Sequence, residues 1–177
     1  VLACAAPSSK APAPAPADAS ERHLRNLRQL TFGGENAEAY FSFDGKELVF
    51  QSTREGGACD QEYVMRTDGS GVRRVSTGAG VVTCGYFFPD GSRILYSSTH
   101  ETMGPECPPK PDRSQGYVWP LHDYQLYTAR PDGSDVRPLA PAPGSYNAEA
   151  TISRDGWIVF TSTRDGDLDL YKMRLDG

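Results

Sequence analysis

The chain has 177 residues, a length within the ordinary range for one folded domain. Its formal net charge of −5 and its lack of any basic tract argue against nucleic acid or an anionic membrane surface as an electrostatic partner. No stretch approaches the ~18 consecutive apolar residues of a transmembrane helix, so the chain is predicted to contact a membrane only through an attached lipid.

The first twenty residues do not have the composition of a folded domain. Val1-Leu2-Ala3-Cys4 resembles the lipobox of bacterial lipoproteins, and this resemblance implies that Cys4 carries a lipid. A chance match is the alternative. Ala5 to Ser20 consists almost entirely of Ala, Pro and Ser, which favours an extended spacer of ~3 Å per residue. We therefore predict a lipobox and linker over residues 1–20 and a folded domain over 21–177.

Beyond Arg22 the sequence has the period of β-strands. Apolar residues alternate or cluster in short runs, and Asp-Gly pairs, which favour tight hairpin turns, separate these runs. An all-β fold is predicted, with almost no helix. The predicted core consists of Leu48 to Phe50, Ile94 to Tyr96 and Ile158 to Phe160.

The Asp-Gly pairs occur in two series and define a repeat. The spacings are 90 − 44 = 46 and 176 − 132 = 44 residues, close to a four-stranded propeller blade, whereas the middle spacing is 132 − 68 = 64. About 20 extra residues therefore lie in the second unit. We predict about three blades, over residues 27–71, 72–135 and 136–177, with an insert at about 99–123.

The repeated phrases resemble a known family. Leu27 to Thr31, Ser42 to Lys46 and Leu48 to Phe50 resemble the TolB-type propeller repeat, also called PD40 or WD40-like, and the likeness extends over nearly all of the chain after the linker. The resemblance implies a non-catalytic scaffold of the bacterial cell envelope, located in the periplasm, that binds a protein or another ligand. Because propellers close with about four to eight blades, three units predict either a longer propeller or self-association through an open blade edge.

A peptidase is the alternative function. Similar repeats precede the hydrolase domain in peptidases of the prolyl oligopeptidase class, so this chain could be a gating propeller whose catalytic domain lies beyond Gly177. The chain itself has no G-x-S-x-G sequence, and its three histidines follow no triad order. No catalytic residue is predicted. The cysteines lack paired C-x-x-C spacing, so no metal or other cofactor is predicted either.

Blade geometry assigns loops to opposite faces of the propeller. The Asp-Gly turns belong to one face, and the more variable second face, which receives the insert, is the predicted binding face. Glu38 and Glu149 lie at equivalent positions on this face. One interpretation is that they hold a cation or a basic group of a partner, and the alternative is that they face water. Tyr117 to Pro120 form an apolar group, either as a lid or as packing for the insert. The predicted binding-face residues are Glu38, His100, Tyr117, Trp119, Glu149 and Arg164.

The cysteines predict one disulfide. With a lipid on Cys4, the three remaining cysteines lie on the second face in a compartment that permits disulfides. Cys84 and Cys107 are the first choice, because antiparallel neighbours of one blade bring them together. A Cys59 to Cys84 bridge between blades is the alternative.

Overall fold

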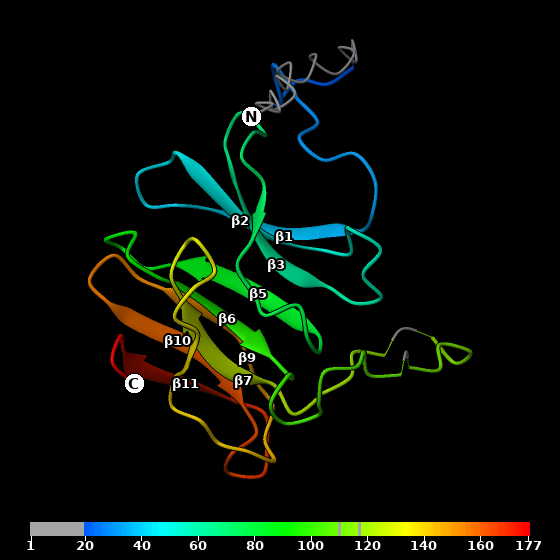
Figure 1. Cartoon of the computed structure of the whole chain (residues 1–177), viewed down its shortest axis with the longest axis vertical. Coiled ribbons are helices and arrows are strands. Elements are labelled where there is room, and N and C mark those ends of the chain that lie inside the picture. Colours follow the sequence, from blue (N-terminus) through cyan, green and yellow to red (C-terminus); the bar gives the residue numbers. More distant parts are fainter. Residues whose placement is uncertain (1–19, 110, 117) are drawn as a thin grey trace, which may run out of the picture.

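A computed structural model, drawn in Figure 1, describes residues 20–109, 111–116 and 118–177. The predicted lipid site at Cys4, the linker up to residue 19 and Tyr117 of the predicted binding face lie outside the described residues. The regular structure of the described residues is β-strand throughout, and none of them forms a helix that could span a membrane. The strands are β1 (Asn36–Phe41), β2 (Glu47–Ser52), β3 (Gln61–Arg66), β4 (Arg73–Arg74), β5 (Val82–Phe87), β6 (Ile94–Ser98), β7 (Gln125–Ala129), β8 (Arg137–Pro138), β9 (Asn147–Ile152), β10 (Trp157–Ser162) and β11 (Asp169–Arg174).

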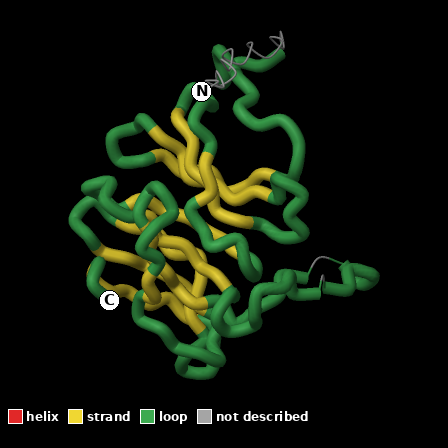
Figure 2. The backbone as a smooth tube through the Cα atoms, in the orientation of Figure 1, coloured by secondary structure: helices red, strands yellow, loops and turns green. Residues whose placement is uncertain are grey.

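Within the described residues these strands form three antiparallel sheets. Their orders are β1-β2-β3-β4, β5-β6-β7-β8 and β9-β10-β11, so each strand pairs with its neighbour in sequence. The sheets lie one after another in space, as the strand colouring in Figure 2 shows. The first strand of the second sheet, β5, contacts the first strands of both other sheets, β1 and β9. This arrangement is a partial propeller and confirms the predicted all-β fold.

The blades begin at a different point from the sequence repeat. The repeat units assign Arg73 and Arg74 to the second unit, but these residues form β4 and pair with β3 of the first sheet. In the same way β8, at Arg137–Pro138, closes the second sheet rather than opening the third. The difference arises because the repeated phrase begins with the last strand of the preceding blade.

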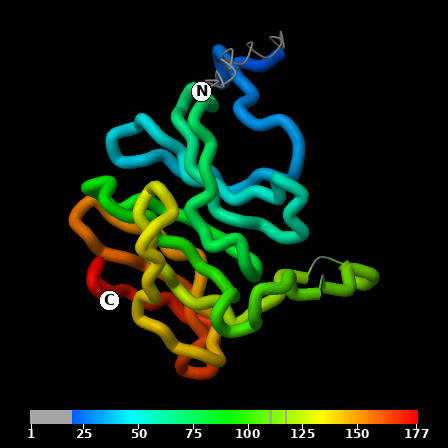
Figure 3. Tube along the Cα trace, viewed as in Figure 1, coloured from blue at the N-terminus to red at the C-terminus, as the bar shows by residue number. Residues whose placement is uncertain are grey.

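Asp-Gly turns connect the first two strands of each sheet. The amide of Gly45 donates to the Ser42 carbonyl at 2.9 Å, and Gly91 and Gly156 make the equivalent bonds. Gly45 has a φ of 72°, which a residue with a side chain rarely adopts. These turns lie along one side of the molecule, and the insert projects from the opposite side (Figure 3). The two faces predicted from blade geometry are therefore present.

Apolar side chains between neighbouring sheets form the core. Val49 and Val64 of the first sheet pack with Phe87 and Tyr96 of the second, and a further cluster joins the second sheet to the third. The predicted core is confirmed apart from Val159, which is 40% exposed. The equivalent residues Val49 and Leu95 pack against the sheet that follows their own. No described sheet follows the third sheet, so Val159 stays uncovered.

Candidate functional site

The inner strand of each sheet carries one residue in an unusual backbone conformation. Glu38, Cys84 and Glu149 have φ values of 51°, 56° and 58°, and the strand register shifts at each of them. Residues other than Gly rarely adopt positive φ, and a β-bulge of this kind redirects a side chain out of the regular alternation. Three equivalent bulges on adjacent strands therefore bring these side chains to one region, which we call the channel cluster.

Neutral hydrogen-bond donors hold the carboxylates of the channel cluster. Glu38 Oε2 accepts from the Cys84 thiol at 3.2 Å and from the Tyr40 hydroxyl at 3.4 Å. Glu149 accepts from the hydroxyls of Tyr146 and Thr161, both at 3.2 Å. Among the described residues neither carboxylate forms an ion pair, although both are exposed.

The thiol of Cys84 is buried and protonated at neutral pH. Burial raises its pKa to about 12, and the carboxylates of Glu38 and Glu149 contribute to the rise, while a hydrogen bond with Thr83 opposes it. The side chain is 5% exposed. A protonated thiol is a donor, in agreement with its bond to Glu38.

Cys84 is therefore expected to resist alkylation in the folded protein. Because only the thiolate reacts, iodoacetamide at pH 8 should modify Cys84 on the order of 10³-fold more slowly in the native than in the urea-unfolded chain. Peptide mapping by mass spectrometry follows this residue separately from any other thiol. Equal rates in the two states would contradict the burial and the hydrogen bonding described above.

Glu62, which is not among the residues predicted from the sequence, lies next to the channel cluster. Its side chain is completely buried, and neither carboxyl oxygen has a hydrogen-bond partner in the described structure. A Cβ on Gly85, the residue after Cys84, would lie 2.2 Å from Glu62 Oε1, so the carboxyl occupies the space that this glycine leaves. Burial raises the pKa of Glu62 well above its usual range, and the charge of Glu38 adds to the effect.

The repeat shows that Glu62 is exceptional. Glu62 on the third strand of its sheet pairs with Gln51 on the second strand. The residues at the same position of the third strand in the other two sheets are Leu126 and Leu170. Leu126 is buried against the third sheet, as expected for this position. Comparison of the three repeats could have identified Glu62, because it is a charged residue where the other two units have leucine.

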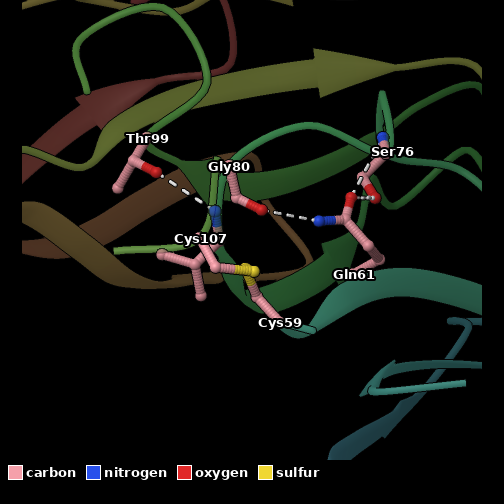
Figure 4. The surroundings of a disulfide bond; sticks show 8 residues. Cys59, Gln61, Ser76, Gly80, Thr99 and Cys107 are labelled. Atoms are coloured by element: carbon pink, nitrogen blue, oxygen red, sulfur yellow. Dashed lines mark hydrogen bonds between the residues drawn. A yellow bond between two sulfur atoms is a disulfide. The ribbon is translucent and has the colours of Figure 1, made fainter. Parts of the chain in front are cut away.

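The structure corrects the disulfide prediction. Cys59 is bonded to Cys107, and among the described residues Cys84 is the free cysteine. Figure 4 shows the bridge beside Gly80, whose amide donates to the Pro105 carbonyl at 2.8 Å. Both predicted pairings were wrong because they used Cys84, whose bulge directs its thiol toward Glu38. The actual bridge joins the β2–β3 loop of the first sheet to the insert of the second.

The bridged insert forms one wall of a groove, which we call the insert groove. Its volume is about 510 Å³, and it lies where the first two sheets meet. A larger pocket of about 800 Å³, between the N-terminal segment and the first sheet, includes no channel-cluster residue. The residues that line the insert groove include Asp60, Thr83, Pro108, Trp119, His122 and Tyr124.

Hydrogen bonds link the insert groove to the channel cluster. Trp119 is 42% exposed, and its indole Nε1 donates to the Tyr146 hydroxyl at 3.2 Å. Tyr146 in turn donates to Glu149, and its ring meets Tyr124 edge to face at 5.8 Å. Trp119 thus packs against the propeller body and still presents a surface to the groove.

Arg164 and His100, both predicted on the binding face, stabilise strand ends. The Arg164 guanidinium lies 5.0 Å from the rings of Phe160 and Tyr171 and bonds to Ser162. His100 takes the equivalent place in the second sheet, with Nδ1 2.8 Å from the Ser98 hydroxyl. These contacts give each side chain a structural role, and its participation in binding remains a prediction.

Within the described part of the chain, no three His, Cys, Asp or Glu side chains form a group that could hold a metal ion. The channel cluster and the insert groove both contain residues of the predicted binding face: Glu38 and Glu149 in the cluster, and Trp119 in the groove.

Comparisons with solved structures identify the fold. A putative TolB from Agrobacterium tumefaciens matches with a TM-score of 0.63 and 21% identity, over 85% of this chain and 49% of that one. TolB from Acinetobacter baumannii matches with a TM-score of 0.61 and 22% identity, over 85% of this chain and 33% of that one. A puromycin-hydrolyzing peptidase from Mycobacterium tuberculosis matches with a TM-score of 0.57 and 15% identity, over 82% and 22% of the two chains.

No protein-family model and no curated protein matches the sequence. The chain spans about half of the length of the Agrobacterium protein and a third of that of the Acinetobacter protein. At these identities the likeness concerns the fold. The chain therefore has the fold of a TolB-like β-propeller, and its described residues form three blades of it.

Proposed function

We propose that this chain is part of a non-catalytic scaffold that binds an extended segment of a protein partner in the insert groove. The observation that carries the proposal is the groove itself, where a disulfide fixes a proline-rich loop against the propeller body. Proline residues and the half-exposed Trp119 ring offer apolar surface in the groove, and polar side chains, among them Asp60 and His122, also line it. Aromatic surface of this kind is enriched in protein interfaces.

We further propose that the scaffold is extracytoplasmic and belongs to the bacterial envelope. A disulfide between two blades is typical of an oxidising compartment, and the TolB likeness supports a periplasmic location. Lipid attachment at Cys4 would place the domain beside a membrane, with the Ala- and Pro-rich linker as a spacer.

Self-association through a blade edge is part of the same proposal. Leu170 on the last sheet is 77% exposed and Phe41 on the first is 64% exposed, whereas their equivalents Leu126 and Phe87 are buried between sheets. A second copy could cover both surfaces with the packing that already joins the blades of one chain.

Selection from a random linear peptide phage library tests the groove. We expect enriched peptides that bind the protein in the micromolar range, and Trp119→Ala should weaken their binding by at least about tenfold, as loss of a buried aromatic anchor does. Trp157→Ala is the matched control, because Trp157 stacks with Arg174 on the third sheet and does not line the groove. Enrichment no better than on an unrelated protein, or equal binding by Trp119→Ala, would contradict the proposal.

A gating propeller of a peptidase is the second candidate function. The similarity to a puromycin-hydrolyzing peptidase, at a TM-score of 0.57, is the observation that favours it. The two functions require different sequences beyond Gly177 in the complete gene product. An α/β-hydrolase pattern there would support the peptidase, and further blades without such a pattern would support the scaffold.

A further inference from the structure

We propose that the channel cluster binds a basic side chain, preferentially an arginine guanidinium, of the segment held in the insert groove. This inference rests on the proposed function and specifies the chemistry of the partner. It assigns a role to Glu38, Cys84 and Glu149, which hold equivalent positions on three adjacent inner strands.

The channel cluster carries negative charge that no cation of the described residues pairs with. The carboxylates of Glu38 and Glu149 are oriented by thiol and hydroxyl donors, and in the described structure no cation pairs with either. The arginines that follow β2 and β10 are engaged elsewhere. Arg54 bonds to Asn36 and Ser52, and Arg164 makes the same bonds in the third sheet. Two fixed carboxylates without a counter-charge attract a cation from outside.

A buried acid, Glu62, lies next to the channel cluster. Glu62 has two unpartnered oxygens, and its carboxyl lies against the backbone at Gly85, next to Cys84. A carboxyl in this position costs stability, and leucine occupies it in the other two repeats. A cation bound nearby would favour ionisation of Glu62 and thereby gain attraction from a third carboxyl.

The channel cluster does not provide a compact set of metal ligands. In the described residues no three potential ligands are close enough for a metal ion. A guanidinium is larger, presents five donors in a plane, and forms charge-assisted hydrogen bonds with carboxylates without having to be enclosed by them. The cluster therefore fits an organic cation better than a metal ion.

Side chains that line the insert groove are hydrogen-bonded toward the channel cluster. Trp119 lines the groove and bonds to Tyr146, which bonds to Glu149. Thr83 also lines the groove, and its hydroxyl lies 3.2 Å from the Cys84 sulfur. A peptide that contacts Trp119 and Thr83 thus has the channel cluster beside it.

Titration with a small probe tests the inference without knowledge of the natural partner. Nα-acetyl-arginine methylamide is added to the ¹⁵N-labelled chain, and Nα-acetyl-citrulline methylamide serves as a neutral probe of nearly the same shape. We expect the arginine probe to shift the amide resonances of Glu38, Cys84 and Glu149, with a dissociation constant in the millimolar range. The citrulline probe should bind at least about tenfold more weakly, because it lacks the charge.

Variants locate the site. Glu38→Gln with Glu149→Gln should weaken arginine binding at least about tenfold, whereas Asp176→Asn, which removes an exposed carboxylate from the opposite face, should leave it unchanged. Equal shifts with both probes, or equal affinity in the double variant, would overturn the inference. If the double variant unfolds, the comparison of the two probes on the unmodified chain decides alone.

The outcomes separate this inference from the proposed function. Peptides that bind the groove and depend on Trp119, combined with an arginine probe that does not bind, would leave the scaffold standing and reject the basic group. If the arginine probe binds at the cluster but no peptide depends on Trp119, the basic-group site stands and peptide binding in the groove is rejected.

Discussion

Removal of the Cys59–Cys107 disulfide is expected to lower the free energy of unfolding by about 4 kcal/mol. The two cysteines are 48 residues apart, and a cross-link that closes a loop of this length removes much of the entropy of the unfolded chain. The loss is a large share of the total stability of a domain, commonly about 5–15 kcal/mol.

Urea unfolding of the Cys59→Ser, Cys107→Ser double variant measures this effect against the oxidised protein. The unmodified chain under reducing conditions should unfold at nearly the same urea concentration as the double variant, because both lack the bridge. Cys84→Ala is the control for loss of a thiol alone. A difference below about 1 kcal/mol between oxidised protein and double variant would show that the bridge does not constrain the unfolded chain.

Glu62→Leu is expected to raise the stability at pH 7 by about 2 kcal/mol. The substitution removes two unpartnered buried oxygens and introduces leucine, which is the residue at the equivalent position of the second sheet. The neighbouring Gly85 has no side chain that would clash with it. Thermal or urea unfolding at pH 7 measures the gain. A destabilised Glu62→Leu variant would mean that the carboxyl has a partner that balances its burial.

The gain should depend on pH in a defined direction. The pKa of Glu62 is higher in the folded than in the unfolded chain, so folding favours its protonated form. Its contribution to stability is complete below the unfolded-state pKa, near 4.5, and is lost as the pH rises toward the folded-state pKa. The advantage of Glu62→Leu should therefore be smaller at pH 4 than at pH 7. Glu62→Gln should also remove this pH dependence, but its buried amide should gain less stability than leucine.

The sequence by itself determined the fold class and most of the blade structure. Short-range physical preferences explain why: the Asp44-Gly45 pair and its equivalents favour hairpin turns, and runs such as Leu48 to Phe50 fit a buried strand. The spacing of these signals also located the insert, which the described structure places between β6 and β7. Alignment of the repeats placed Glu38 and Glu149 at equivalent positions, and the backbone geometry adds Cys84 as the third member of this set.

Only the tertiary structure decided which of these residues meet. The pairing of Cys59 with Cys107 depends on how the insert folds back over the first blade, and the Cys84 bulge directs its thiol into the channel cluster. The burial of Glu62 depends on the second blade, whose Gly85 leaves the space that its carboxyl fills. Periodicity encodes the strands because each strand follows from its own residues, whereas the disulfide, the channel cluster and the insert groove arise from contacts between blades far apart in the chain.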